Sequence, residues 1–320
     1  MPGAARLWYN TDMPIVMKNV TYKYMRNTQL ERAALRDVSL RVGEGEFVGV
    51  IGRTGSGKST LIQHFNGLLK PDAGTVEVDG VATAGRRLRE LRRKVGLVFQ
   101  FPEYQLFEET VFKDIAFGVA KLGLGEGEVR ERVLGAAEAA GFPEQMLGRS
   151  PFELSGGQRR RAAIAGVLVM EPKYLIMDEP ASGLDPAGRE ELFEYVSQLR
   201  AEKGTCVVLV SHNMDDIARY ARRVVVMDGG RITMDGAPED VFTRILELEQ
   251  AGLRPPDIQY FMRRFKETVA PGIDGRALTV RDAAELVDKW LWAARAAGAA
   301  GGCGCGGGGA TTTTFAEEGA

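Results

Sequence analysis

The sequence predicts an α/β protein with a parallel-sheet core, an antiparallel β subdomain, a helical subdomain and a small C-terminal helical extension. Residues 15–24 and 35–42 alternate apolar and polar side chains, which is typical of half-exposed antiparallel strands. Later apolar runs at residues 174–177 and 206–210 are continuous, as in strands that are buried on both faces. Helical stretches separate these later runs, and this alternation favours a parallel sheet.

Bulk composition limits the classes of function. The 320 residues suffice for one large domain and an appendage. The 41 Lys and Arg residues against 43 Asp and Glu residues give a formal charge of −2, so nucleic acid is not an expected partner. Cys206, Cys303 and Cys305 cannot form a disulfide framework for a chain of this size, which indicates a reducing, cytosolic setting. Residues 1–14 have no apolar signal segment, and no apolar run is long enough to span a membrane.

The first strand ends near an aromatic residue that precedes the glycine-rich region. Tyr24 can stack on an adenine ring from this position, although a strand tyrosine is more often a packing residue.

A phosphate-binding pattern organises the rest of the chain. It follows an apolar strand at residues 46–51, precedes a helix at residues 61–65, and matches G-x-x-x-x-G-K-[ST] in full. The residues are Gly52, Arg53, Thr54, Gly55, Ser56, Gly57, Lys58, Ser59 and Thr60. Glycines let backbone N–H groups surround a phosphate, the lysine adds a positive charge, and the hydroxyl of Ser59 can reach Mg²⁺. The alternative, a chance turn in a chain with 40 glycines, becomes untenable when the later motifs are included.

Polar residues also follow the later apolar strands. Gln100 ends a strand at residues 95–99, and His212 follows the strand at residues 206–211, so both should lie where ligands bind in α/β sheets. His64, the other histidine, lies in the helix after the phosphate loop and should have a structural role.

Two acids follow the apolar strand that begins at residue 174. Asp178 is expected to hold Mg²⁺ through its water shell, and Glu179 to orient and polarise the attacking water. Without the phosphate loop, an acidic turn before Pro180 would be an equally good interpretation.

A second glycine-containing helix start is formed by Ser155, Gly156, Gly157 and Gln158. Ser155 is a candidate N-cap that could donate to a phosphate oxygen, whereas the sequence in isolation would indicate an ordinary turn. The arginine run at residues 159–161 is interpreted as a solvated helix face.

The domain boundaries follow from these patterns. We expect an N-terminal extension at residues 1–14 and a nucleotide-binding domain at 15–236, with its helical subdomain at about 104–165. Three helices are expected at 238–251, 255–266 and 279–294, within a C-terminal domain at 237–295. Residues 296–320, rich in Gly, Ala and Thr, should be disordered.

Together these motifs resemble the ATPase subunits of ATP-binding cassette (ABC) transporters over residues 15–236, and so imply a P-loop NTPase (RecA-like) core. The segment 101–110 and the helical extension are similar to the ATP-binding subunits (EcfA) of energy-coupling factor (ECF) transporters, which import vitamins and metal ions. The resemblance implies that Tyr24 contacts adenine, that residues 52–60 bind the phosphates, and that Glu179 is the catalytic base. It places Ser59, Gln100 and Asp178 on Mg²⁺, and His212 at the γ-phosphate.

The resemblance also implies partners. A second ABC ATPase subunit, identical or paralogous, would dimerise head to tail, so that residues 155–158 reach across to its ATP and Asp185 lies in the connecting D-loop. An integral membrane coupling subunit (EcfT-like) and a substrate-binding S component would place the chain on the cytoplasmic face of the cell membrane as a peripheral protein. Glu103, Glu108 and Glu109 either meet a basic coupling helix or form a solvated acidic loop. A soluble ABC-type ATPase or a nucleotide-gated regulator is the alternative function.

Overall fold

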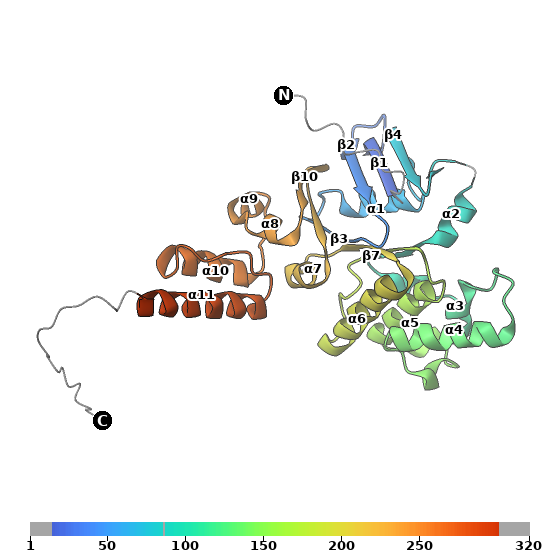
Figure 1. Ribbon diagram of the computed structural model, residues 1–320. Helices are drawn as coiled ribbons and strands as arrows, with labels where there is room; N and C mark the ends of the chain where they lie inside the picture. Colours follow the sequence, from blue (N-terminus) through green and yellow to red (C-terminus); the bar gives the residue numbers. More distant parts are fainter. Residues whose placement is uncertain (1–14, 86, 301–320) are drawn as a thin grey trace, which may run out of the picture.

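Two β-sheets and the helices around them make up the computed structural model, which describes residues 15–85 and 87–300. Figure 1 shows the small sheet beside the phosphate-loop helix, the helices α3, α4 and α5 at one end, and α10 and α11 at the other. Residues 1–14 and 301–320, with Cys303, Cys305 and most of the expected disordered tail, lie outside the described residues.

The smaller sheet is antiparallel, with strand order β2-β1-β4-β5. Its strands are β1 (Ile15–Tyr24), β2 (Arg32–Val42), β4 (Ala73–Val78) and β5 (Val81–Ala82). Ile15, Met17 and Val20 of β1 are buried and the residues between them are more exposed, so the expected alternation is confirmed for the first half of β1, and register shifts interrupt the pairing with β2 from Met17 onward. β4 and β5 were not predicted from the sequence.

The larger sheet has the strand order β10-β9-β3-β8-β7-β6, and only β10 is antiparallel to its neighbour. The strands are β3 (Phe47–Gly52), β6 (Val95–Val98), β7 (Tyr174–Asp178), β8 (Cys206–Val210), β9 (Arg223–Asp228) and β10 (Arg231–Gly236). The predicted α/β fold with a parallel core is confirmed.

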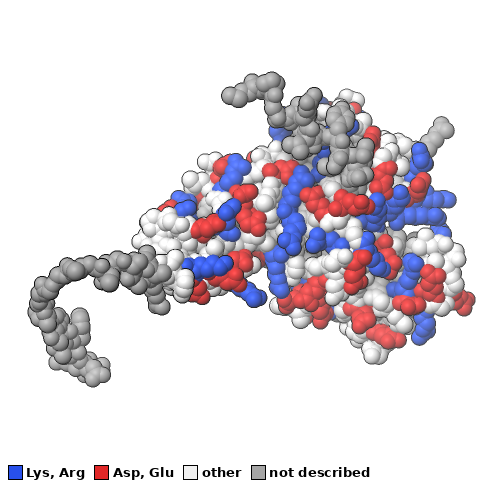
Figure 2. Space-filling view, viewed as in Figure 1, with Lys and Arg blue, Asp and Glu red and all other residues white. Residues whose placement is uncertain are grey.

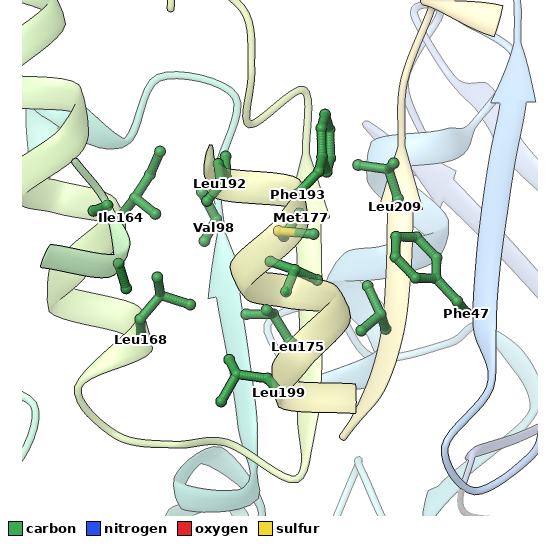
Figure 3. Close-up of a cluster of buried hydrophobic side chains, with 14 of the residues drawn as sticks. Phe47, Val98, Ile164, Leu168, Leu175, Met177, Leu192, Phe193, Leu199 and Leu209 are labelled. Carbon is green, nitrogen blue, oxygen red and sulfur yellow. The ribbon is translucent and has the colours of Figure 1, made fainter. Parts of the chain in front are cut away.

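The central strands are apolar throughout because both of their faces are covered. Leu175 and Met177 of β7 pack with Phe193 and Ile164 in the cluster drawn in Figure 3. The alternate residues of β7, such as Ile176, belong to a second core on the side of the antiparallel sheet. Burial of both faces removes the alternation that a half-exposed strand would have.

Helices connect and cover these strands. They are α1 (Lys58–Phe65), α2 (Leu88–Lys94), α3 (Val111–Phe117), α4 (Glu126–Ala139), α5 (Gly156–Leu168), α6 (Pro186–Lys203) and α7 (Met214–Tyr220). Short 3-10 helices are η1 (Pro102–Gln105), η2 (Glu144–Met146) and η3 (Pro151–Glu153).

The C-terminal extension contains α8 (Pro238–Phe242), α9 (Ile245–Gln250), α10 (Asp257–Thr268) and α11 (Val280–Ala300). The single helix expected at 238–251 is divided, because Arg244 leaves the helical region with ψ of 52°. The Thr279 side chain accepts a hydrogen bond from the backbone N–H of Asp282 (3.1 Å) and so caps the start of α11. α11 continues to Ala300, beyond the expected start of disorder at residue 296, because alanine is the strongest helix former. The domain boundaries themselves stay a prediction.

Candidate functional site

The phosphate loop joins the end of β3 to the start of α1 and has no room for side chains at two positions. A Cβ at Gly52 would lie 2.4 Å from the Met227 carbonyl oxygen, and one at Gly57 would lie 2.5 Å from that of Ala34. Gly57 also has φ of 105°, a conformation that favours glycine. The Gly230 N–H donates to the Ser56 carbonyl (3.0 Å), so the loop is held between the two sheets.

Lys58 bends back over this loop. Its Nζ donates to the carbonyl oxygens of Gly52 (2.6 Å) and Arg53 (3.1 Å). Burial lowers the pKa of the ammonium, whereas the charges of Glu179 and Asp178 act in the opposite direction. A partly desolvated cation beside the backbone amides of the loop is suited to bind a polyphosphate.

Asp178 ends β7 beside the phosphate loop and is only 6 % exposed. Burial raises the pKa of its carboxyl, opposed by a hydrogen bond from the Ser59 side chain and by the charge of Lys58. This pair of oxygen ligands fits Mg²⁺, which is commonly held by one or two protein groups together with water and substrate phosphates. Within residues 15–85 and 87–300, no cluster of three or more His, Cys, Asp or Glu forms a self-sufficient metal cage.

Glu179 has a left-handed backbone conformation, with φ of 52°. Its Oε2 lies 2.7 Å from Nδ1 of His212, which follows β8 and is 77 % exposed at its side chain. The carboxyl ends of β6, β7 and β8 thus bring Gln100, the two acids and His212 to the same edge of the sheet, as their positions after apolar strands predicted.

These groups all line one cavity of about 630 Å³. Of the residues predicted to contact nucleotide or metal, its lining contains Tyr24, Gly52, Arg53, Thr54, Gly55, Gly57, Lys58, Ser59, Thr60, Gln100, Asp178, Glu179 and His212. Ser56 does not line it, because its side chain is buried beneath the loop. The lining residues that sequence reasoning missed are Arg32, Ala34, Met214, Gly252, Leu253 and Arg254. Arg32 and Ala34 continue the strand that pairs with Tyr24, but residues 252–254 carry no motif that could have identified them.

Tyr24 is 40 % exposed and its hydroxyl lies 3.2 Å from Oγ1 of Thr60. Its ring packs edge-on against Tyr22, whose ring contacts His64 in the same manner. His64 is buried, and its Nδ1 lies 2.7 Å from the Thr60 carbonyl oxygen, so the expected structural role is confirmed. Stacking of adenine on Tyr24 stays a prediction.

Residues 155–158 are not part of this cavity. Ser155 and Gln158 form a capping box at the start of α5: the Gln158 N–H donates to Ser155 Oγ (3.3 Å), and the Ser155 N–H donates to Gln158 Oε1 (3.0 Å). Ser155 and Gly156 are exposed and do not line the cavity that contains this chain's own phosphate loop. Asp185, at the start of α6, pairs with Arg161.

The solvated helix face expected for residues 159–161 is wrong for Arg160, which is 5 % exposed. Arg160 donates to the carbonyl oxygens of Gln100 (3.0 Å) and Glu179 (2.6 Å). A guanidinium has five donors, which makes burial tolerable where several acceptors converge.

Comparison with known proteins agrees with the fold and the cavity. The family pattern described as ABC transporter matches residues 35–182. The matched span contains the phosphate loop, Asp178 and Glu179, so the fold and the site are those of the ATP-binding cassette class. EcfA2 of Acetivibrio thermocellus, named an energy-coupling factor transporter ATP-binding protein, is 50 % identical over 279 residues, or 87 % of this chain and 99 % of the relative. EcfA2 of Symbiobacterium thermophilum is 55 % identical over 246 residues, 76 % of this chain and 85 % of the relative. The chain belongs to this family of energy-coupling factor transporter ATP-binding proteins.

Solved structures give the same result. CbiO1 from Clostridium perfringens, part of the ABC transporter complex cbiONQ, has a TM-score of 0.65 at 37 % identity, covering 79 % of this chain and 99 % of that one. The ATP-binding cassette MJ0796, solved as a dimer in a post-hydrolysis state with ADP and Pi, has a TM-score of 0.65 at 31 % identity, with coverage of 70 % and 98 %.

Proposed function

We propose that this chain is the ATP-binding and ATP-hydrolysing subunit of an ECF-type ABC importer, which powers uptake of vitamins or metal ions through separate membrane proteins. The observation that carries this proposal is the convergence of Lys58, Asp178, Glu179 and His212 on one cavity in a member of the ECF ATP-binding family. A soluble ABC-type ATPase or a nucleotide-gated regulator is not favoured, because relatives that match over almost their whole length are named transporter subunits.

The chemistry requires positioning and charge neutralisation more than covalent catalysis. Amides of residues 52–60 and the Lys58 ammonium would bind the phosphates, and Tyr24 would contact adenine. Glu179, at the strand edge, would take the proton of the attacking water, and His212 would donate to the γ-phosphate. The contact between Glu179 Oε2 and His212 Nδ1 (2.7 Å) keeps the proposed base and the proposed γ-phosphate donor side by side in the cavity lining.

Mg²⁺ would be held by Ser59, Asp178 and Gln100, and when bound it would neutralise charge on the β- and γ-phosphates. The proximity of the Ser59 hydroxyl to the buried Asp178 carboxyl supports this assignment. Gln100 lies at the cavity wall and could reach the same ion with its side-chain oxygen.

A second cassette would complete the site. The exposed Ser155 and Gly156 at the start of α5 offer backbone N–H groups, and they do not line their own chain's cavity. A head-to-tail partner, identical or paralogous, would receive them at its ATP, with Asp185 beside the interface.

A groove of about 1050 Å³ beside the segment after Gln100 is the proposed docking site for the membrane coupling subunit (EcfT-like), which would in turn join the S component. Phe107 and Phe117 line this groove, and their exposed rings meet edge-to-face with centroids 5.1 Å apart. Arg89, Arg92, Arg93 and Lys121 also line the groove, and Figure 2 shows basic side chains gathered over α2. Large exposed apolar groups rimmed by polar residues mark interaction sites.

The acidic residues after Gln100 do not line this groove. Glu103 lies 3.6 Å from Nη1 of Arg160 and Glu109 pairs with Lys113, so both are engaged within the chain. The groove therefore suits the apolar face of a coupling helix, and these glutamates are not its lining. No helix among the described residues of this chain is long and apolar enough to cross a bilayer itself.

A pull-down tests the proposal. The tagged chain should recover an integral membrane protein from solubilised membranes, and the assembly should hydrolyse ATP. Glu179→Gln should leave ATP binding nearly unchanged and lower kcat by at least about a hundredfold, because the base is lost. Full turnover by Glu179→Gln would overturn the assignment of the base, and absence of any membrane partner would overturn the transport function.

A further inference from the structure

Arg160 is a charged residue in the interior of the protein, two positions after the capping box of α5. Arginine is almost never fully buried unless its donors are satisfied. The acceptors that surround it come from two different strand ends, so this side chain has more than a local role.

The guanidinium binds three main-chain carbonyl groups. Its Nη2 donates to Gln100 (3.0 Å) and Glu179 (2.6 Å), and its Nε donates to Pro180 (3.2 Å). Nη1 lies 3.6 Å from the Glu103 carboxylate. One rigid planar group therefore joins the segment after β6 to the segment after β7.

The backbone of Glu179 needs such support. A φ of 52° is uncommon for a residue other than glycine and persists only where its surroundings fix it. The Glu179 N–H donates to the Val210 carbonyl (2.9 Å), and its own carbonyl accepts from Arg160. Held on both sides, the residue directs its carboxylate at His212.

Arg160 also reaches the loop that leads to the docking groove. Glu103 belongs to η1, and the residues that follow it, Gln105 to Phe107, line the groove. A shift of this loop would be transmitted through the same guanidinium to the main chain at Glu179.

We propose that Arg160 is a positioning residue for ATP hydrolysis, which fixes the main chain of Glu179 and Gln100 relative to each other and links both to the loop beside the docking groove. This inference rests on the proposed role of Glu179 as the base. Arg160 does not line the nucleotide cavity, so it acts through those two residues.

The test uses the assembly recovered with the tagged chain. Arg160→Gln should lower kcat by about tenfold or more and change the Kd for ATP by less than about twofold, because it affects the reacting geometry and not ground-state binding. Arg160→Lys should restore only part of kcat, because an ammonium cannot reproduce the planar fork. Arg200→Gln is the matched control: Arg200 is also partly buried and donates to a carbonyl, that of Gly45, away from the cavity.

A double-variant cycle separates positioning from a purely structural role. If Arg160 acts mainly through the base, Arg160→Gln should lower kcat much less in the Glu179→Gln background than in the unchanged chain, with only the part that acts through Gln100 remaining, since residues that act as a unit are non-additive. An independent tenfold loss in that background, or an equal loss in ATP binding and kcat, would overturn the inference.

Glu103→Gln keeps the proposal testable if Arg160→Gln fails to fold. It leaves the three carbonyl contacts intact but removes the charged link to the loop, so kcat should fall by about two- to threefold with an unchanged Kd for ATP. Wild-type kcat in Glu103→Gln, or in folded Arg160→Gln, would overturn the inference while leaving the proposed function intact. Failure of the proposed function would show instead as a wild-type assembly without ATPase activity.

Discussion

Gly252, just after α9, lies directly against the side chain of Arg53 in the phosphate loop. A Cβ at Gly252 would be 2.3 Å from Cδ of Arg53, and Gly252 has φ of 70°. Leu253, the next residue, is buried with the main core, so this turn is fixed to the nucleotide-binding part of the molecule. The C-terminal extension is thus in contact with the proposed ATP site.

Replacement of Gly252 by alanine should therefore affect both stability and binding. The left-handed backbone should cost about 1–2 kcal/mol in free energy of unfolding, and displacement of Arg53 should weaken ATP binding by about two- to fivefold. Denaturant unfolding and a fluorescent-nucleotide titration measure the two effects. Gly275→Ala, at a position with open space and no left-handed φ, is the control. Equal behaviour of the two variants would contradict the prediction.

Lys58→Met should weaken ATP binding by at least about tenfold, because the desolvated ammonium supplies the loop's positive charge. Isothermal titration of the purified chain with Mg-ATP measures the change. Lys203→Met removes a lysine that pairs with Glu171 on the surface, and it should bind ATP as the unchanged chain does. Wild-type affinity for ATP in Lys58→Met would mean that the phosphates of ATP do not bind at this loop.

The buried His64 should make stability depend on pH. Burial lowers its pKa below the ordinary value of 6.5, although the hydrogen bond to the Thr60 carbonyl opposes this. As the pH falls through 6.5, the unfolded chain takes up a proton that the folded chain does not, so the free energy of unfolding decreases.

The slope from this single group is at most about 1.4 kcal/mol per pH unit. Denaturant unfolding at several pH values between neutrality and mild acid, on the unchanged chain and on His64→Gln, isolates it. The His64→Gln variant should have the shallower dependence. Parallel curves for the two proteins would mean that the imidazole is protonated equally in the folded and unfolded states.

The docking groove can be tested without disturbing the nucleotide site. Phe107→Ser removes an apolar ring from the groove and should reduce recovery of the membrane partner by about fivefold or more, while ATP affinity stays at the wild-type level. Phe152→Ser is a matched control, since Phe152 is exposed and lies outside the groove. Comparable partner recovery with both variants would place the docking surface elsewhere.

Much of the site could be predicted because its parts follow local rules. The glycine spacing around Lys58, and the polar residues that follow apolar strands at Gln100, Asp178 and His212, depend only on backbone geometry and on the common direction of parallel strands. The same rules located the N-cap at Ser155, whereas the reciprocal bond from the Ser155 N–H to the Gln158 side chain was not predicted.

The missed features depend on contacts between distant segments. Arg160 looks like part of a solvated arginine run until the carbonyls of Gln100 and Glu179 are folded around it. Gly252 and Arg254 reach the cavity only because α8 and α9 pack on the core, and no short pattern in the sequence encodes this.

The tight seat of the phosphate loop has a mechanical consequence. The loop packs closely on both sides, because Gly52 lies against the Met227 carbonyl and Gly57 lies against that of Ala34. The hydrogen bond from the Gly230 N–H to the Ser56 carbonyl also connects the loop to the β9–β10 hairpin. The phosphate loop therefore joins the two sheets at the nucleotide site. We expect any movement of the sheets during ATP turnover to carry both of them together. The helices α3, α4 and α5 meet the large sheet through the apolar contacts of the main core and through the buried guanidinium of Arg160.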